Sequence, residues 1–408
     1  MRSWMRRFVG FASLPLIAAA GGVVAFPLVA RNVSPQDWAA LTVGQSLGLL
    51  GAIVVGLGWP VVGAAVVAQA DPEGRRRIYA DALTSRVAAA VVVTPIAAGL
   101  AVVVAPGDGH ALTCALMAVA TTLSGLSIAW FCVGSAAPRE IAAFEIAPRV
   151  SGLVLGGLAV AASGKASFYP AVIAVSTISG LGAYSRRVLG PSPVRALVST
   201  HPVWTLRTHG KLALIETSAA SFTSGLGFLS GFFLSVPELA RLGSGERLSQ
   251  VLLPSIAALS NTVHPWLAVA PQDEFRRRAL RVGALHVAAG VLLLLALGLA
   301  GPLASKLLFG PGLQAPAPVC WTLGAYLLFV NLQTVACRHI LVTQRQTGHA
   351  VRANVLAALI AVPLVLVGAK VAGSVGAVSG MATGELLIFL FALPAALRCV
   401  RLLRRWSA

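Results

Sequence analysis

Long apolar runs, separated by short connections rich in arginine, are the feature of this sequence that most limits how it can fold. Of its 408 residues, 57% are hydrophobic and only 11% are charged, whereas soluble globular domains carry roughly 25% charged residues. A helix needs about 20 apolar residues to cross the hydrocarbon core of a bilayer. Runs of this length recur along the whole chain, and they exclude an ordinary soluble enzyme.

The number and spacing of these runs predict an all-α, polytopic membrane protein with about twelve transmembrane helices. The predicted spans are residues 8–30, 38–60, 84–105, 111–133, 141–162, 168–185, 212–234, 246–269, 282–305, 316–338, 351–370 and 374–396. The basic N-terminus could be mistaken for a secretory signal. Because the first apolar run continues to Ala30 and further spans follow, we expect an uncleaved first helix.

The distribution of basic residues predicts the topology. The chain carries 31 Lys and Arg against 13 Asp and Glu, a formal net charge of +18. Most of these cations, Arg86 included, fall at alternate connections, and Lys and Arg collect on the cytoplasmic side of membranes. We therefore expect a multi-pass protein of a bacterial cytoplasmic membrane with both termini cytoplasmic, whose charge meets anionic lipids rather than nucleic acid. The opposite side receives Arg31, Lys165, Arg241, Arg247, Lys306 and Lys370.

A weak internal repeat predicts the domain organisation. At a constant offset, Ser34–Leu47 aligns with Ser235–Leu248, pairing Ser34 with Ser235 and Asp37 with Glu238. An even number of spans in each half makes the halves parallel repeats, and such bundles enclose a central cavity. We predict two parallel six-helix bundles around a central cavity. Their bounds are 1–188 for the N-terminal bundle, 189–210 for a cytoplasmic linker and 211–408 for the C-terminal bundle.

The connections offer little that could perform catalysis. Asp108 and His110 stand in a Pro-Gly-Asp-Gly-His segment that is typical of a turn, and no GxxxxGK[ST] phosphate-binding loop is present. The five cysteines lack metal-ligand spacing and lie in or beside apolar runs, which indicates free buried thiols. Neither a re-entrant filter nor a ring of like charges suggests a channel. We expect no catalytic residue, no metal, no cofactor and no enzymatic activity.

Four stretches, in order along the whole chain, resemble polysaccharide flippases of the Wzx type, a branch of the multidrug/oligosaccharidyl-lipid/polysaccharide exporter superfamily. The stretches are Pro27–Leu41 with Gln45–Leu49, Trp130–Phe131 with Gly134, Pro237–Leu248, and Leu307–Gly312. The lipid II flippase branch has two additional helices, for which no room follows Arg405. A peptidoglycan precursor is therefore the less expected cargo.

This resemblance implies a transporter that moves a polyprenyl-pyrophosphate-linked oligosaccharide from the inner to the outer leaflet by alternating access. It also implies contact with membrane lipids and with polysaccharide polymerase or glycosyltransferase machinery. The nearest competing function is that of a drug or cation antiporter of the same superfamily. Such antiporters rely on membrane-embedded acids in the first bundle, where Glu145 is the only candidate. A membrane glycosyltransferase or polymerase, and a non-transporting scaffold, also compete with the flippase interpretation.

Polar side chains within the spans are the candidate site residues, since charge inside a bilayer is costly and needs a partner or a cavity. The candidates for binding cargo are Arg31, Gln45, Arg247, Gln250, Asn261, Asn331 and Glu385. The candidates for coupling are Glu216, Glu385 and His264.

Each candidate also has a structural interpretation. The arginines suit phosphate oxygens, or else they reach the lipid interface. The amides could bind sugar hydroxyls or join two helices, and Glu385 could bond a neighbouring helix. Glu216 could cap a helix or reach the interface.

Three further groups of polar residues lie in or near the spans. Glu145 and Arg149 are spaced for a local ion pair. Arg338 and His339 could meet a pyrophosphate or lipid headgroups, and His286 shares with His264 the ability to titrate near neutral pH.

Overall fold

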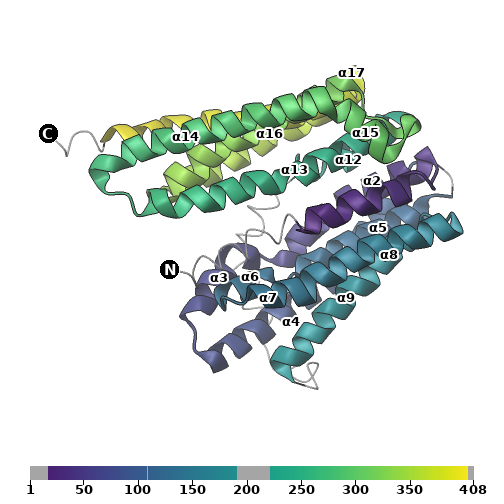
Figure 1. Cartoon of the computed structure of the whole chain (residues 1–408), viewed down its shortest axis with the longest axis horizontal. Helices are drawn as coiled ribbons and strands as arrows, with labels where there is room; N and C mark the ends of the chain where they lie inside the picture. Colours follow the sequence, from purple (N-terminus) through teal and green to yellow (C-terminus); the bar gives the residue numbers. More distant parts are fainter. Residues whose placement is uncertain (1–16, 108, 191–220, 403–408) are drawn as a thin grey trace. The chain divides into compact units, whose positions relative to one another are not determined.

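The computed structural model describes residues 17–107, 109–190 and 221–402, and in these residues the chain is helical, with no strand (Figure 1). It separates into two compact units, Met1–Ala220 and Ser221–Ala408. Almost all of the predicted linker 189–210 lies outside the described residues, so the predicted domain bounds remain a prediction. Exposed valine and leucine side chains cover the outer faces of several helices, as at Val91, Val103 and Leu359. Such surfaces suit lipid rather than water.

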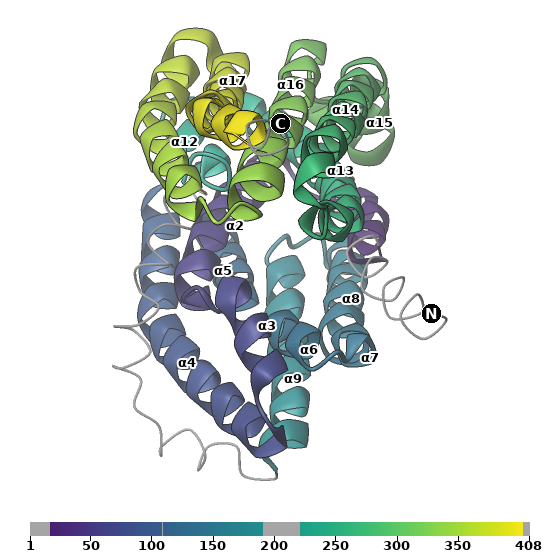
Figure 2. The ribbon, with the colours of Figure 1, turned by 90° about the vertical axis from the view of Figure 1, so that its left-hand side faces the viewer.

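In the N-terminal unit, α2 packs against α5, α4 against α5, and α8 against α9 (Figure 2). A helix over Ile17–Ala30 precedes α2. The helices are α2 Pro35–Gly56, α3 Trp59–Gln69, α4 Pro72–Val103, α5 Ala111–Thr122, α6 Ala129–Gly134, α7 Pro138–Ile141, α8 Ala147–Ser163 and α9 Phe168–Leu189, with a 3-10 turn at Leu123–Leu126 and a π-helical turn at Ala142–Ile146.

In the C-terminal unit, α13, α14, α16 and α17 run alongside one another, and α16 contacts each of the other three. The helices are α12 Leu226–Gly231, α13 Val236–Ala268, α14 Gln272–Leu295, α15 Gly301–Phe309, α16 Ala317–Thr334 and α17 Thr347–Leu402, with π-helical turns η3 at Ala296–Ala300 and η5 at Val335–Val342 and a 3-10 turn at Pro311–Leu313.

Seven helical stretches of the described chain are long and apolar enough to cross a membrane, which makes the chain a multi-pass membrane protein. They are Pro35–Gly56, Pro72–Val103, Ala111–Gly134, Pro138–Ser163, Gln272–Phe309, Ala317–Val342 and Thr347–Val400. This number is lower than the predicted twelve for identifiable reasons. The Ile17–Ala30 helix is short, α9 and α13 are long but more polar, and Thr347–Val400 counts once although it holds two predicted spans. The predicted span 212–234 lies partly outside the described residues. The number twelve therefore remains a prediction.

The last of these stretches contains two predicted spans. Helical geometry is interrupted at Ala372 and Gly373, and Gly373 has a positive φ of 61°. Glycine adopts this left-handed conformation without the steric cost that a side chain would bring. The chain turns back here, so that Gly380 packs against Leu364 and Gly384 against Ala361. α17 is thus an antiparallel helical hairpin, in agreement with the predicted spans 351–370 and 374–396.

The aligned serines of the internal repeat have the same structural role. Ser34 is the N-cap of α2, where its hydroxyl accepts from the Asp37 backbone N–H at 3.1 Å and donates to the Asp37 carboxylate at 2.7 Å. Ser235 is the N-cap of α13, and its hydroxyl donates to the Glu238 carboxylate at 2.8 Å within a capping box. Both caps satisfy backbone groups at a helix start. The helices α2 and α13, which begin within the aligned segments, therefore start with the same kind of N-cap.

Candidate functional site

A polar cluster in the C-terminal unit is built around His339. Its ring lies on the π-helical turn η5, with no exposed surface. The two ring nitrogens contact His264 of α13 at 3.3 Å and His286 of α14 at 3.1 Å. Ser260, one turn before His264 on α13, places its hydroxyl oxygen 3.1 Å from His339 Nε2. The His339 imidazole thereby joins η5 to both α13 and α14.

Asn331 completes this cluster on the buried side. Its Oδ1 lies 2.8 Å from His286 Nδ1, while its Nδ2 donates to the Leu327 carbonyl oxygen at 3.0 Å. Both Asn331 and His286 are fully buried. Polar groups in such surroundings are costly unless they are hydrogen-bonded, and here both are. We call Ser260, His264, His286, Asn331 and His339 the histidine cluster.

Arg338 and Asn261 lie beside the histidine cluster. Both side chains are exposed, and Arg338 Nη2 donates to Asn261 Oδ1 at 2.6 Å. A guanidinium carries five N–H donors in a planar fork, so this one bond leaves other donors directed to the surroundings. The site therefore combines an exposed cation with a buried chain of imidazoles.

Two candidates predicted from the sequence, Asn331 and His264, meet in this cluster, and a third, Asn261, lies beside it through its bond to Arg338. The sequence interpretation of Asn331 as a group that joins two helices agrees with its contact to His286. His264 does more than lie at an interface, because it also contacts His339. His339 and Ser260 were not among the predicted coupling residues, although the occurrence of His264, His286 and His339 within apolar runs of the second half was a signal that could have found the group.

Glu385 lies elsewhere in the C-terminal unit, on α17. It is only 5% exposed, and in the described part of the chain its Oε2 has no hydrogen-bond partner. It lies close enough to Tyr326 and Cys337 to act on them electrostatically. A buried carboxyl oxygen without a hydrogen bond is unfavourable, so Glu385 is a second position where this unit places a polar side chain in its interior at a cost in stability.

The remaining candidates are distributed over both units. Arg247 is 3% exposed on α13, and its Nη1 donates to the Gly243 carbonyl oxygen at 3.3 Å. Gln250, also on α13, is half-buried. In the N-terminal unit, Arg31 is exposed just after the helix Ile17–Ala30 and Gln45 is half-buried on α2. Glu216 lies outside the described residues.

The N-terminal unit holds a buried cation that the sequence interpretation placed at a cytoplasmic connection. Arg86 instead lies within α4 and is fully buried. Its Nη1 donates to the Ser127 carbonyl oxygen at 2.8 Å, and its guanidinium stands 5.2 Å from the centre of the Trp130 ring. The aromatic face and the carbonyl compensate for the loss of water around the cation.

Glu145 lies near this cation and is bonded to the same residue, Ser127, so its negative charge partly offsets that of Arg86. Its carboxylate accepts from the Ser127 hydroxyl at 2.7 Å and from the Ile128 backbone N–H at 3.0 Å. The sequence predicts an ion pair with Arg149, but the carboxylate is turned to these two groups instead. They lie where the helix is interrupted between α5 and α6, so the free backbone N–H groups there compete successfully for the carboxylate.

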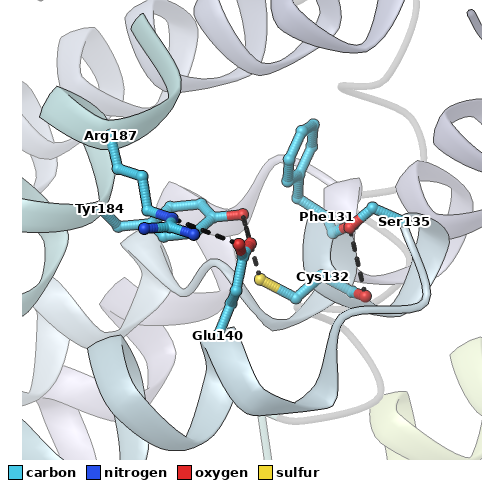
Figure 3. Close-up of polar contacts among 6 residues, drawn as sticks. All are labelled: Phe131, Cys132, Ser135, Glu140, Tyr184 and Arg187. Atoms are coloured by element: carbon cyan, nitrogen blue, oxygen red, sulfur yellow. Dashed lines mark hydrogen bonds and ion pairs between the residues drawn. The ribbon is translucent and has the colours of Figure 1, made fainter. Parts of the chain in front are cut away.

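A second polar group ties α7 to α9 in the same unit (Figure 3). Tyr184 donates its phenolic hydrogen to Glu140 at 2.8 Å and accepts from the Cys132 thiol at 3.3 Å. Arg187, one turn further along α9, pairs with the same Glu140 at 3.3 Å. Tyr184 is fully buried, whereas the Arg187 side chain is 62% exposed. These contacts hold α7 against α9, which is a structural role.

Among the described residues, no group of three His, Cys, Asp or Glu side chains has the geometry to hold a metal ion. The histidine cluster accordingly pairs its imidazoles with one another and with neutral groups. The cysteines in the described residues are free thiols, as predicted. Proton transfer and anion binding are the chemistry that imidazoles and a guanidinium offer in this arrangement.

No protein family model matches the chain, and no curated protein matches it in sequence. Solved structures match over almost the whole length. A multidrug resistance MATE family transporter of the MOP superfamily, in an inward-facing conformation, is 12% identical, with a TM-score of 0.65 over 97% of this chain and 96% of its own. The eukaryotic MATE transporter AtDTX14 is 15% identical, with a TM-score of 0.60 over 99% of each chain.

A third similar structure is a MOP superfamily transporter from Pyrococcus furiosus, which is 11% identical with a TM-score of 0.54 over 98% of this chain and 96% of its own. It is described as having a binding pocket of reverse polarity that suggests a different function. At such low identity these likenesses show the fold alone. The chain therefore has the fold of MATE-type transporters of the MOP superfamily over almost its entire length.

Proposed function

We propose that this protein is a membrane transporter that flips a polyprenyl-pyrophosphate-linked oligosaccharide from the inner to the outer leaflet by alternating access. The oligosaccharide would be a unit of an exopolysaccharide, a capsule or an O-antigen-like polymer. The MOP-type fold and the sequence resemblance to Wzx flippases support this assignment. In this proposal the protein lies in a bacterial cytoplasmic membrane with about twelve spans and both termini cytoplasmic, and its two bundles alternate around a central cavity.

The observation that supports the proposal most directly is that the Glu145 carboxylate is already hydrogen-bonded within the protein. A cation antiporter needs an available acid in its first bundle, and Glu145 was the only candidate in the predicted spans there. Its carboxylate is bound by the Ser127 hydroxyl and the Ile128 N–H. It also acts electrostatically on the buried Arg86. Because Glu145 is committed to the protein's own groups, the geometry favours an anionic cargo over a cationic one.

The basic residues of the spans would meet the pyrophosphate. Arginine binds phosphate oxygens through two parallel N–H donors, and Arg31, Arg247 and Arg338 are the arginines that we assign to this role. Gln45, Gln250, Asn261 and Asn331 would bind sugar hydroxyls or hold the helices that do so. Glu385, Glu216 and His264 are the candidates for coupling. We expect the protein to work beside polysaccharide polymerase or glycosyltransferase machinery, without nucleic acid and without a cofactor.

The main competing function is that of a drug or cation antiporter with the same fold. MATE transporters are among the similar structures, but the Pyrococcus protein indicates that binding pockets of this fold differ in polarity. A direct test reconstitutes the full chain in vesicles and follows a fluorescent polyprenyl-pyrophosphate sugar between leaflets. Accelerated flipping supports the proposal. Export of a cationic dye without binding of the lipid pyrophosphate would overturn it in favour of the antiporter.

A cellular test separates the flippase from a polymerase and from a scaffold. Deletion of the gene should cause a lipid-linked oligosaccharide to accumulate in the inner leaflet. Accumulation of flipped but unpolymerised units would instead indicate a polymerase. Replacement of Arg31, Arg247 and Glu385 should reproduce the deletion, whereas full function after these substitutions would indicate a non-transporting scaffold.

A further inference from the structure

Three imidazoles in the C-terminal unit lie in a row from a partly exposed ring to a fully buried one. His264, on α13, is partly exposed and lies one turn before the end of that helix at Ala268. His339 follows, with ring centres 5.4 Å apart, and His286 comes next at 5.0 Å. Both inner rings are fully buried. Such a row of ionisable groups within a membrane protein has a cost in stability that indicates a function.

Asn331 determines the direction of this row. Its Nδ2 donates to the Leu327 carbonyl oxygen, so its Oδ1 is the atom that faces His286 Nδ1 at 2.8 Å. An amide oxygen is only an acceptor. His286 must therefore carry its hydrogen on Nδ1, which leaves a lone pair on Nε2 when the ring is neutral.

The same reasoning assigns the tautomers of His339 and His264. His286 Nε2 lies 3.1 Å from His339 Nε2, so in the neutral state His339 must be the donor and carry its hydrogen on Nε2. Its Nδ1 is then an acceptor, 3.3 Å from His264 Nδ1, and His264 must carry its hydrogen on Nδ1. Each neutral ring thus has one assigned tautomer, and His264 Nε2 is left as a basic lone pair at the partly exposed end.

We propose that His264, His339 and His286 form a directed proton relay that takes up a proton at His264 and stores it on His286. An N–H bond forms at His264 Nε2. The N–H bond at His264 Nδ1 breaks as one forms at His339 Nδ1, and the N–H bond at His339 Nε2 breaks as one forms at His286 Nε2. One proton has entered, and the positive charge now resides on His286.

No heavy atom needs to move for this transfer. In the final state every contact along the row is still a hydrogen bond, with donor and acceptor exchanged at each. Ser260 suits both states, since its hydroxyl can share the Nε2 hydrogen of His339 with His286 before the transfer and can donate to the Nε2 lone pair alongside His286 afterwards. Asn331 cannot pass the proton on, because its amide oxygen already accepts from His286 and has no hydrogen to release. His286 is therefore the end of the relay.

The charges around the row favour the binding of an anion nearby. Arg338 of η5 is the charged group that acts on all three rings, and the other groups acting on His339 are the two histidines themselves. No carboxylate from α13, α14 or α17 acts on them within the described residues. A proton on His286 therefore adds to the charge of Arg338. If the proposed function holds, the pyrophosphate of the cargo would balance this charge, and proton uptake and cargo binding would favour each other.

The tautomers provide a direct test. The full chain, labelled with ¹⁵N-histidine and placed in lipid nanodiscs, is studied by NMR at alkaline pH, with signals assigned from His264→Gln, His286→Gln and His339→Gln. The expected result is hydrogen on Nδ1 of His264 and His286 and on Nε2 of His339. On acidification, the first imidazolium should be His286, while the other two rings change tautomer together. Hydrogen on Nε2 of neutral His286, or rings that titrate independently, would overturn the proposal.

Variants of α16 separate the relay from general loss of structure. Asn331→Leu is close in shape but removes the acceptor, and it should give His286 a mixture of both tautomers. Thr322→Val on the same helix is the matched control, because the Thr322 hydroxyl bonds only Pro318 and Val319 of its own helix. It should leave all three tautomers unchanged. An Asn331→Leu protein that keeps a single Nδ1–H tautomer at His286 would contradict the assignment.

A last measurement distinguishes failure of the relay from failure of the proposed function. Proton uptake by the nanodisc protein is recorded with a pH indicator, with and without added polyprenyl pyrophosphate. If the lipid increases proton uptake and His286→Gln abolishes it, both the relay and the proposed function are supported. Uptake through His286 without any effect of the lipid keeps the relay and rejects the cargo, whereas lipid binding with uptake unaffected by His286→Gln rejects the relay.

Discussion

Gly368 and Gly376 face each other across the α17 hairpin so closely that a Cβ atom on Gly368 would overlap the Gly376 carbonyl oxygen. The obstacle is backbone, which cannot rotate away as a side chain can. The two arms of the hairpin are therefore held at a distance that only glycine permits. This contact allows the two arms, which are separated by the break at Ala372 and Gly373, to pack closely against each other.

The first prediction follows from this contact. Gly368→Ala should destabilise the protein by about 1 to 3 kcal/mol, as overpacking typically does, and should lower the thermal unfolding temperature in detergent. The control is Gly348→Ala on the same helical stretch, where a Cβ would meet nothing within 4 Å. That substitution should change stability by less than about 1 kcal/mol. Equal effects of the two variants would show that the hairpin is not held by close backbone contact.

The second prediction concerns Arg86 and Glu145. Arg86→Met should destabilise the N-terminal unit by about 1 to 3 kcal/mol, because it leaves the Ser127 carbonyl oxygen without its donor and removes the cation that acts electrostatically on Glu145. Adding Glu145→Gln should recover part of the loss. The measurement is thermal unfolding of the single and double variants in detergent.

Arg77→Met is the matched control for this pair. The Arg77 side chain is 75% exposed beside Glu73 on the same helix, and its loss should cost at most about 1 kcal/mol. Additive effects of Arg86→Met and Glu145→Gln would argue against coupling between the two residues.

The third prediction concerns Tyr184. Tyr184→Phe removes the donor to Glu140 and should cost about 1.5 to 3 kcal/mol, the range for hydrogen bonds to charged groups. Arg187→Gln removes the other partner of Glu140, but this arginine is 62% exposed and its loss should cost no more than about 1 kcal/mol. Unfolding temperatures should fall in that order. The reverse order would mean that the exposed ion pair, rather than the phenol, holds α7 to α9.

The fourth prediction tests the proposed topology. A reporter enzyme fused after Arg404 should be active on the cytoplasmic side, because basic connections remain there. A reporter inserted at Lys165, between α8 and α9, should report the opposite side. Both reporters on one side would exclude the alternation of basic connections that the proposal uses.

The helical hairpins and their caps were accessible from sequence because their causes are local. Ser34 and Ser235 lie where a polar turn meets an apolar run, and each is followed by an acid at the capping-box position. The spans 351–370 and 374–396 were separated correctly by their apolar lengths. The domain bounds and the roles of the candidate site residues remain predictions, since they depend on the cavity and the cargo.

The burial of Arg86 could not be predicted from sequence. It follows three arginines in a basic stretch, and the local pattern placed it with them at a membrane surface. Its partner Ser127 lies between α5 and α6 and its partner Trp130 lies on α6, so the aromatic ring that covers it is about forty residues away. A positive charge is recognised as buried only when the groups that replace its water are known.

An all-α chain of apolar helices follows from the amino-acid sequence, because bilayer thickness sets the length of a span and cap chemistry sets where it begins. Which polar groups meet depends on the packing of the helices in three dimensions. His264, His286 and His339 lie on separate helices, and only packing places their ring nitrogens within hydrogen-bonding distance. Hydrogen bonds act over about 3 Å, whereas sequence periodicity shows which face of a helix a residue occupies but not which residue it faces.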